Sequence, residues 1–423
     1  MPLPRWLFTH SASFCIGGTV SAVVAVWLQS SHREQDKVVG DGDGYNNHSI
    51  SFTVGNIVNK GCAVGLPIHT YHPNNNLTIA FDTRTKNPLF VMERLTTHQI
   101  DNNSAMASRK NKRFHEEQSL LPYFRSRNQN YRNSGYDRGH LAPAADFNLN
   151  DKDINDTFVL TNVSPQLPKF NRSIWLRLEE FVRSVAKNEG TSSTSEIETE
   201  TWVITGPLWL PSSIKRSSDT VSENFAYEYE GIGKPPSLVA VPTHFFKVVV
   251  VVEKKLTGKQ QFTKDNNTNA QVLESSRETS ELILKKFGAF VLPHSDHVGK
   301  NDKGIRLVDY LVRLTDLEAV TGLEFFPALF GTYTNIEMNE TSHTNSIPLG
   351  KEIADALTDD IRLSSSSKSL KGGSFLVQLS NNNNEEYSKG RRRKIKEMLH
   401  KNTPLPIQHL CKNNEGCFKI LRV

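Results

Sequence analysis

The sequence predicts an α+β fold, because strand-like runs occupy much of the chain and one long segment has helical periodicity. Residues 201–205 and 244–252 consist mainly of β-branched and aromatic side chains, which is typical of buried strands. Between residues 171 and 187, apolar side chains recur at helical spacing and form one stripe, made of Ile174, Leu178, Phe181, Val182 and Val185. We find no internal repeat.

Residues 1–48 are excluded from the predicted fold. Residues 1–33 contain no Asp or Glu, and the apolar run 14–28 is short for a membrane span, which needs about 20 residues. We expect a mitochondrial presequence that also anchors in the inner membrane. A secretory signal peptide is the alternative, because the length of the apolar run fits one. An apolar core helix is disfavoured, because polar sequence follows at once.

Strands and turns are expected over residues 49–100, with strands at 78–82 and 89–93 on either side of a turn-rich segment. Residues 101–118 are polar and basic, so we expect a loop. Residues 131–145 contain Gly, Asp and Pro, which excludes a long helix there.

The organisation predicted for the chain is one domain over residues 49–335 and a basic extension over 336–423. Segments near 188–200 and 255–280 are rich in Ser, Thr, Asn, Glu and Lys, which indicates insertions on surface loops. A short helix is expected within 305–321.

The positive charge is concentrated near the C-terminus. The chain has a formal net charge of +5, and residues 387–423 carry ten Lys/Arg and two Glu, so this tail is +8 and the rest is −3. A polyanion must therefore bind the body of the protein through a local patch. We expect the cluster 390–396 to be solvated, with contact to nucleic acid or anionic lipid as the alternative.

Four cysteines are too few for a disulfide scaffold. Cys411 and Cys417 lack a second pair at zinc-finger spacing. Two unlinked thiols are expected, and a local disulfide in an oxidising compartment is the alternative.

The chemistry-bearing residues fall in three segments. The first is Tyr-Asp-Arg-Gly-His-Leu-Ala-Pro-Ala at 136–144, and the second is Thr-Asn-Val-Ser-Pro-Gln at 161–166. In the third, four residues recur every four positions: Asn171, Trp175, Glu179 and Arg183. On a helix this spacing places them on one slowly drifting face. Trp175 is expected to lie in the core rather than to stack on a base.

These residue types suit cleavage of a phosphodiester. His140 has an intrinsic pKa that allows it to take a proton from water near neutral pH. The side-chain oxygen of Asn171 could bind a hard cation such as Mg²⁺ directly, and Glu179 could bind the waters of that ion. Arg138 and Arg183 could neutralise phosphate charge.

The three segments, taken together, closely resemble the DNA/RNA non-specific endonuclease family, and within it the endonuclease G branch. Further matching stretches include Thr-Gly-Pro-Leu at 205–208 and Val-Pro-Thr-His-Phe-Phe-Lys-Val at 241–248. The resemblance covers roughly residues 60–330. It implies a ββα-metal nuclease fold, with an antiparallel sheet core and flanking helices. A hairpin would present His140 as general base, and a helix would present Asn171 and Glu179 to Mg²⁺, with Mn²⁺ as a possible substitute.

The resemblance also implies which residues position the reacting groups. Asp137, Arg138, Asn162 and Arg183 would position His140 and the phosphate. Arg109 matches, in a poorly aligned loop, an arginine that helps to stabilise the transition state.

For the whole protein, the resemblance implies an endonuclease acting on DNA and RNA and leaving 5′-phosphate and 3′-hydroxyl ends. It implies a homodimer in mitochondria, at the inner membrane or in the intermembrane space. Secretion is the alternative, but glycosylation of the Asn-X-Ser sites at Asn162 and Asn171 would block the site. The other activities considered are a mitochondrial 5′-exonuclease of the same fold and a catalytically silent nucleic-acid-binding protein.

Two features lie apart from the family pattern. Asp146 stands where endonuclease G commonly has a neutral polar residue, so an extra acid lies near the expected ion. His294 and His297 have the spacing of a metal-binding pair, but no other ligand cluster accompanies them, so we expect no metal there.

Overall fold

A computed structural model describes a body that lies within residues Val54–Val423. The described residues are 66–100, 108–191, 193, 197–211, 213–216, 223–255, 263–264, 271–272, 282–296, 306–331, 349–364, 393 and 407–418. The expected N-terminal targeting segment, most of the insertion near 255–280 and nearly all of the basic cluster 390–396 lie outside them. In the described part of the chain, no helix has both the length and the apolar character that a membrane crossing requires.

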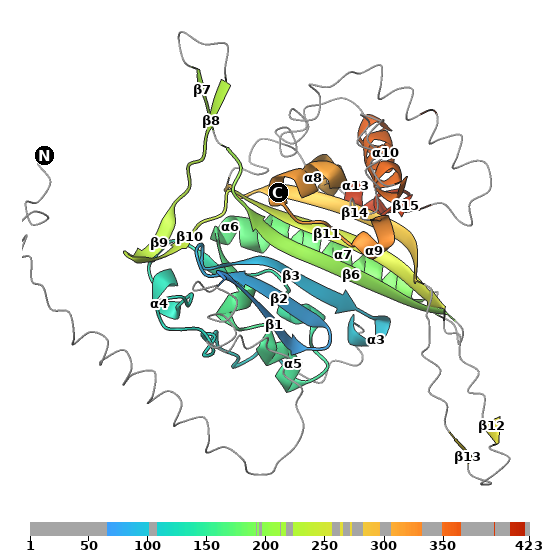
Figure 1. Ribbon diagram of the computed structural model, residues 1–423, viewed down its shortest axis with the longest axis horizontal. Coiled ribbons are helices and arrows are strands. Elements are labelled where there is room, and N and C mark those ends of the chain that lie inside the picture. The colour runs from blue at the N-terminus through green and yellow to red at the C-terminus, as the bar shows by residue number, and fades with distance from the viewer. Residues whose placement is uncertain are drawn as a thin grey trace, which may run out of the picture. The chain divides into compact units, whose positions relative to one another are not determined.

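A seven-stranded sheet forms the centre of the structure (Figure 1). In spatial order its strands are β1 (Ile68–Asn74), β2 (Leu77–Asp82), β3 (Asn87–Leu95), β6 (Ile197–Leu208), β11 (His244–Lys255), β14 (Leu282–Pro293) and β15 (Gln408–His409). All neighbours pair antiparallel except β14 and β15, which are parallel. The strands expected at 78–82, 89–93, 201–205 and 244–252 are confirmed as parts of β2, β3, β6 and β11.

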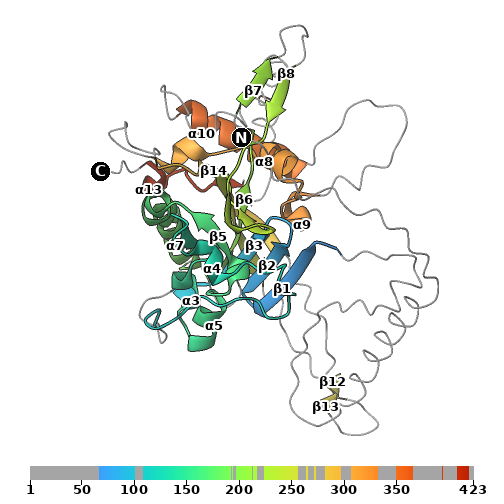
Figure 2. The same ribbon diagram turned by 90° about the vertical axis from the view of Figure 1, so that its left-hand side faces the viewer.

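The run of apolar residues in β11 follows from burial on both faces of the sheet. Successive side chains of a strand point to opposite faces. Accordingly Phe245 and Val249 belong to one core, and Phe246 and Val248 belong to the other. The first core is covered by α7 (Leu176–Gly190), and the second by α8 (Leu314–Thr321), α9 (Pro327–Phe330) and α10 (Leu349–Ser364) (Figure 2).

A hairpin and a helix follow one another on the α7 side of the sheet. Strand β4 (Asp137–His140) pairs antiparallel with β5 (Val163–Gln166). The chain then continues through α6 (Pro168–Phe170) and a π-helical turn, η5 (Asn171–Trp175), into α7. This is the order strand, strand, helix. The antiparallel sheet with flanking helices confirms the predicted α+β fold. The predicted helix at 171–187 is also confirmed, although its first turn, η5, is π-helical rather than α-helical.

The remaining described elements are short. The helices are α3 (Thr97–Ile100), α4 (Asn128–Tyr131), η3 (Ala144–Asp146), α5 (Asp151–Asp156), η4 (Leu160–Asn162) and η6 (Leu307–Tyr310). Three two-stranded ribbons are formed by β7 (Ser213–Arg216) with β8 (Glu223–Ala226), β9 (Gly231–Lys234) with β10 (Ser237–Ala240), and β12 (Thr263–Lys264) with β13 (Gln271–Val272). The short helix expected within 305–321 is α8. It ends at Gly322, whose φ of 67° is readily adopted only by glycine.

Two described segments beyond residue 335 pack against the domain. Helix α10 contacts α8 and α9, and the segment with β15 and α13 (Glu415–Phe418) extends the sheet. Cys411 and Cys417 are fully buried and form a disulfide with an S–S distance of 2.09 Å. The expectation of two unlinked thiols is therefore wrong, because the turn between the two residues brings their Cα atoms to 5.4 Å.

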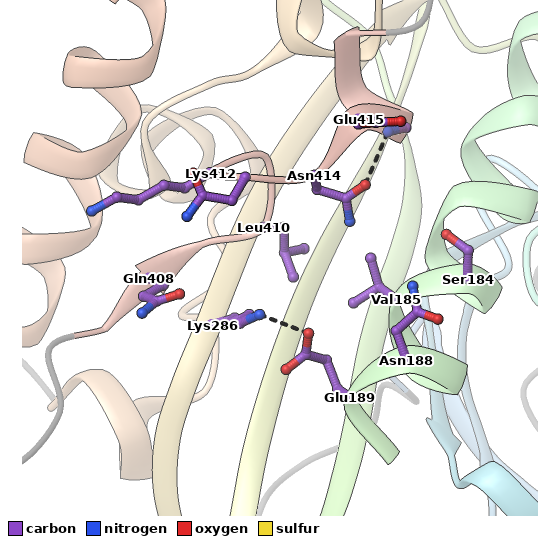
Figure 3. Close-up of a pocket in the computed structure, with 12 residues that line it drawn as sticks. Ser184, Val185, Asn188, Glu189, Lys286, Gln408, Leu410, Lys412, Asn414 and Glu415 are labelled. Atoms are coloured by element: carbon purple, nitrogen blue, oxygen red, sulfur yellow. Dashed lines mark hydrogen bonds and ion pairs between the residues drawn. The ribbon is translucent and has the colours of Figure 1, made fainter. Parts of the chain in front are cut away.

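A cavity of about 510 Å³ lies between this C-terminal segment, α7 and β14 (Figure 3). The ion pair of Lys286 Nζ with Glu189 Oε1, at 2.6 Å, lies in its wall. Its α7 residues are Ser184, Val185, Asn188 and Glu189, whereas the predicted site residues of this helix are Glu179 and Arg183. The cavity therefore does not include the predicted site.

Candidate active site

The hairpin places His140 in a nearly closed pocket. The residue is only 8% exposed, and its ring lies 4.9 Å from the rings of both Phe114 and Phe158. Its Nε2 atom is buried and has no hydrogen-bond partner. Burial, and then the positive charge of Arg109, lower the pKa of His140 to about 3. The imidazole is therefore neutral at physiological pH and carries a nitrogen lone pair or N–H that the protein does not use.

The backbone of this hairpin is fixed by its neighbours. His140 pairs with Val163, and its carbonyl oxygen accepts a hydrogen bond from Trp175 Nε1 at 3.3 Å. Trp175 is fully buried, as expected for a core residue. At Gly139, a Cβ atom would lie 2.2 Å from Gln166 Cδ, so a larger residue would require the buried Gln166 side chain to move.

Asn171 is held against the first strand of the hairpin. Its Nδ2 donates to Asp137 Oδ2 at 3.1 Å, and the guanidinium of Arg172 donates to both oxygens of the same carboxylate at 3.0 and 3.1 Å. Because the amide nitrogen faces Asp137, the amide oxygen of Asn171 points to the other side and is left for another partner. Asp137 therefore orients Asn171 rather than His140.

Asn162 connects the segments on either side of the hairpin. Its Oδ1 accepts from the backbone N–H of Ala142 at 3.0 Å, and its Nδ2 donates to the carbonyl oxygens of Ala142 and Thr157 at 2.9 and 2.8 Å. It is fully buried. The structure thus places Asn162 as a brace for the chain that follows His140, and its hydrogen bonds go to the backbone rather than to the imidazole.

Glu179 and Arg183 lie on the buried face of α7. Glu179 is 8% exposed, and burial raises its pKa to about 8. Arg183 Nη1 donates to Asp146 Oδ1 at 2.9 Å, and the Asp146 side chain is 2% exposed. Asp146, the acid that departs from the family pattern, is therefore paired with Arg183. Burial raises the pKa of Asp146, while the Arg183 charge opposes that shift.

Beneath these groups lies a buried pair contributed by the sheet. Lys247 of β11 donates to Thr205 Oγ1 at 2.6 Å and to Leu141 O at 3.4 Å, and its Nζ is 3.6 Å from Glu93 Oε1. Its Nζ also lies 5.3 Å from the ring centre of Trp175. Lys247 and Glu93 are each 1% exposed. Lys247 of the sheet therefore contacts Leu141, which follows His140 in the chain, and Trp175, which donates a hydrogen bond to the carbonyl of His140.

Two arginines border the imidazole pocket. Arg109 lies 5.9 Å from the ring centre of Phe158, and its charge lowers the pKa of both His140 and Glu179. Arg138 is exposed, lies 5.0 Å from the ring centre of Phe114 and donates to Asn128 Oδ1 at 2.9 Å. The structure therefore brings Arg109 and Arg138 to the aromatic rings that enclose His140, while Arg183 is held by Asp146 deeper in the domain.

His294 connects β14 to the segment that leads into η5. Its Nδ1 lies 2.7 Å from Pro242 O, and its Nε2 accepts from the backbone N–H of Leu167 at 2.7 Å. The carbonyl can only accept and the N–H can only donate, so the ring carries its proton on Nδ1 and is neutral. Burial lowers its pKa, in agreement. The carbonyl of Leu167 in turn accepts from the N–H of Asn171 at 2.9 Å. His294 thus positions the start of the helix that carries Asn171.

Replacing His294 with leucine should lower the free energy of unfolding by about 1–3 kcal/mol, because the Leu167 N–H is then buried without an acceptor. The variant His294→Gln should recover part of this loss, since a carboxamide can both donate and accept. Chemical denaturation of the two variants measures the difference. Equal stability of the leucine and glutamine variants would show that the acceptor is unimportant.

Within the described residues, no three His, Cys, Asp or Glu side chains form a cluster that could hold a metal ion. The free amide oxygen of Asn171 and the buried carboxyl of Glu179 are oxygen donors of the kind that Mg²⁺ and Mn²⁺ accept.

The known proteins that are similar in sequence to this chain include several nucleases. The mitochondrial nuclease of Saccharomyces cerevisiae is 34% identical over 259 residues, which cover 61% of this chain and 66% of that protein. The mitochondrial endonuclease G of Bos taurus is 33% identical over 252 residues, covering 59% and 66%, and that of Homo sapiens is 32% identical over 265 residues, covering 62% and 72%. The chain thus aligns with slightly under two thirds of the yeast and bovine proteins.

A crystal structure of an EndoG/EndoGI complex aligns with 63% of this chain and 89% of that chain, at 32% identity and a TM-score of 0.45. The sequence model of the family described as DNA/RNA non-specific endonuclease matches residues 56–331. That match covers most of the chain and includes the hairpin, η5 and α7, which confirms the resemblance seen in the sequence. The chain belongs to the DNA/RNA non-specific endonuclease family.

Proposed function

We propose that this protein is an endonuclease that hydrolyses phosphodiester bonds of DNA and RNA. The observation that carries the proposal is the neutral imidazole of His140, whose buried Nε2 has no hydrogen-bond partner in the described part of the chain. His409 of β15 also has a buried Nε2 without a hydrogen-bond partner among the described residues, so what distinguishes His140 is its place on the hairpin, in an aromatic pocket bordered by Arg109 and Arg138. Membership of the family supports the same reaction class.

Each residue of the site has a separate role in this reaction. Neutral His140 accepts the proton of the attacking water. Arg109 and Arg138, which border its pocket, attract and orient the phosphate. Asp137 holds the amide of Asn171 in place, and Asn162 fixes the backbone that follows His140.

A divalent cation, Mg²⁺ or Mn²⁺, fits the donors that remain. Asn171 would hold it through its amide oxygen, and Glu179 would hold its waters. When bound, such an ion stabilises negative charge on the phosphate and on the departing 3′-oxygen, so the products carry 5′-phosphate and 3′-hydroxyl ends. A nearby cation also favours the ionised form of Glu179 against the effect of burial.

The setting of the enzyme is part of the proposal. The relatives named above are called mitochondrial, and the acid-free start of this chain suits mitochondrial import. We infer a mitochondrial enzyme at the inner membrane or in the intermembrane space, where the Cys411–Cys417 disulfide is compatible with an oxidising environment. We further infer a homodimer, a catalytic domain over residues 49–335 and a basic tail that contacts nucleic acid or anionic lipid.

The purified full chain should nick a covalently closed circular plasmid in the presence of Mg²⁺ and should not do so in excess EDTA. The variant Asn171→Ala should need far more Mg²⁺ for half-maximal nicking, because it lacks the amide oxygen. The matched control Asn188→Ala, in the cavity wall beside the C-terminal segment, should behave as the unmodified protein. A closed circle has no end, so cleavage of it also excludes a pure 5′-exonuclease. If closed circles stay intact under all divalent ions, the enzyme proposal is wrong and the protein is a silent binder or an exonuclease.

A further inference from the structure

One loop on the surface displays an apolar cluster. In the segment 118–127, which leads into α4, Leu121 is 53% exposed, Tyr123 is 59% exposed and Phe124 is 39% exposed. The rings of Tyr123 and Phe124 contact each other edge to face, with centroids 4.5 Å apart. Scattered apolar side chains on a surface need no explanation, but a contiguous group points to an interaction.

Two arginines of the loop hold its backbone through hydrogen bonds to carbonyl oxygens. Arg127 donates through Nε and Nη2 to Pro122 O at 3.0 and 2.6 Å. Arg125 donates to Leu120 O at 2.6 Å and to Gln118 O at 2.7 Å. These bonds hold the backbone on both sides of the two rings. A ligand that stacks there loses less affinity to ordering of the protein than it would on a loose loop.

The segment that contains the loop carries the basic charge of the domain body. Residues 109–138 include eight Lys/Arg and three Asp/Glu, a net charge of +5. The chain without its basic tail has a net charge of −3, so the part of it outside residues 109–138 is −8. The exposed cations of the segment are Arg109, Lys110, Arg113, Arg132 and Arg138. A polyanion that approaches the body is therefore drawn to this segment.

The end of the loop is tied to the borders of the imidazole pocket. Asn128 follows Arg127, accepts a hydrogen bond from Arg138 at 2.9 Å and donates to Phe114 O at 2.8 Å. Phe114 contacts the His140 ring at 4.9 Å. Asn128 and Phe114 thus link the loop that carries the exposed rings to the pocket of His140.

A second exposed pair of aromatic residues lies among acidic rather than basic side chains. Tyr227 and Tyr229 are 63% and 56% exposed, as much as the first pair. They alternate with Glu228 and Glu230, which are also exposed. Like charges repel the phosphates of a nucleic acid here, so this pair is unsuited to the same ligand although its rings are equally available.

We propose that Tyr123 and Phe124 form a stacking platform for unpaired bases of a single-stranded nucleic acid whose phosphates lie along the basic segment 109–138. The inference rests on the proposed nuclease function and adds to it a preference for unpaired over duplex substrate. Stacking on aromatic rings tolerates any base sequence, because every base has a π face. A duplex presents no free base face except at its ends, so it gains nothing from the platform.

Binding to a matched pair of oligonucleotides tests the platform. Both are short single strands with the same phosphates and a fluorescent end label, but one has abasic sugars throughout. In a His140→Ala background, which prevents cleavage, fluorescence anisotropy should show the base-bearing strand to bind about 5- to 150-fold more tightly. The variant Tyr123→Ala/Phe124→Ala should bind both strands with the affinity of the abasic one. The control Tyr227→Ala/Tyr229→Ala should keep the full preference.

The dependence on salt separates stacking from charge. The platform variant loses no cation, so the slope of log affinity against log salt should be unchanged. The proposal is overturned if the platform variant keeps the preference for bases, or if it loses as much affinity for the abasic strand as for the base-bearing strand. It is also overturned if the mass of the variant in solution halves, which would assign the rings to a contact between two copies of the chain.

The proposed function and the platform fail separately. Cleavage of closed plasmid by the unmodified protein tests the first. If the plasmid is cleaved and the base-bearing and abasic strands bind equally, only the platform is wrong.

Discussion

Replacing His140 with alanine should lower the single-turnover rate of plasmid nicking by about 10²- to 10⁴-fold, the usual contribution of a positioned general base. The backbone at His140 is held by pairing with Val163 and by Trp175, so the variant should keep the fold, which the thermal unfolding midpoint checks. The exposed His72 is the matched control, and His72→Ala should nick at the unmodified rate. Equal nicking by the two alanine variants would remove His140 from the mechanism.

The pH dependence follows from the low pKa of His140. A base works in its deprotonated form, so its contribution is complete above its pKa and is lost as the pH falls through it. With a pKa of about 3 in the free protein, kcat/KM should show no imidazole inflection between about pH 5 and pH 8. A bound phosphate favours the imidazolium, so the inflection in kcat should lie at higher pH than that in kcat/KM. An inflection of kcat/KM near the ordinary histidine value would contradict the burial of this ring.

Replacing Lys247 with methionine should lower the free energy of unfolding by about 3–5 kcal/mol at a pH where Glu93 is ionised, because its buried carboxylate then lacks a cation. The double variant Lys247→Met/Glu93→Gln should recover much of the loss, since no buried charge is left. Lys234→Met, at an exposed position of β9, should change stability by less than about 0.5 kcal/mol. Urea denaturation measures all three.

The effect of Lys247→Met should also depend on pH. Burial raises the pKa of Glu93 well above its usual value. A carboxyl whose folded pKa is raised takes up its proton more readily in the folded state, so stability is retained at low pH and falls as the pH rises through the folded pKa. The destabilisation should therefore be larger near about pH 8 than near about pH 5. A loss of stability that does not vary with pH, or a double variant as unstable as the single one, would show that Lys247 acts through packing alone.

Local patterns were enough to predict the main elements of the fold. The valine run of β11 is uniformly apolar because the strand is buried on both faces, and the stripe from Ile174 to Val185 is the buried face of α7. The π-helical turn at Asn171 was not predictable, because its sequence still fits ordinary helical spacing. The disulfide was not predictable either, since its formation depends on how the turn at residues 411–417 folds against the sheet and α7.

The candidate site was only partly predictable for a similar reason. Motifs and their spacing single out His140, Asn171 and Glu179 as candidates, but the partners of each residue depend on tertiary contacts. Sequence reasoning missed Arg172, which shares Asp137 with Asn171, and the aromatic rings around His140. It also missed Lys247, although one signal was present: a cation within the otherwise apolar run 245–252 has to meet a buried partner.

The account depends most on His140 and Asn171 serving one phosphate. A crystal structure of the His140→Ala variant with Mn²⁺ and a short single-stranded oligonucleotide tests this most directly. We predict an anomalous peak for Mn²⁺ within about 2.0–2.3 Å of Asn171 Oδ1, with the scissile phosphate between the ion and the space that the imidazole vacates. A Mn²⁺ peak bound away from Asn171, or a phosphate out of reach of residue 140 with the ion in place, would contradict the account.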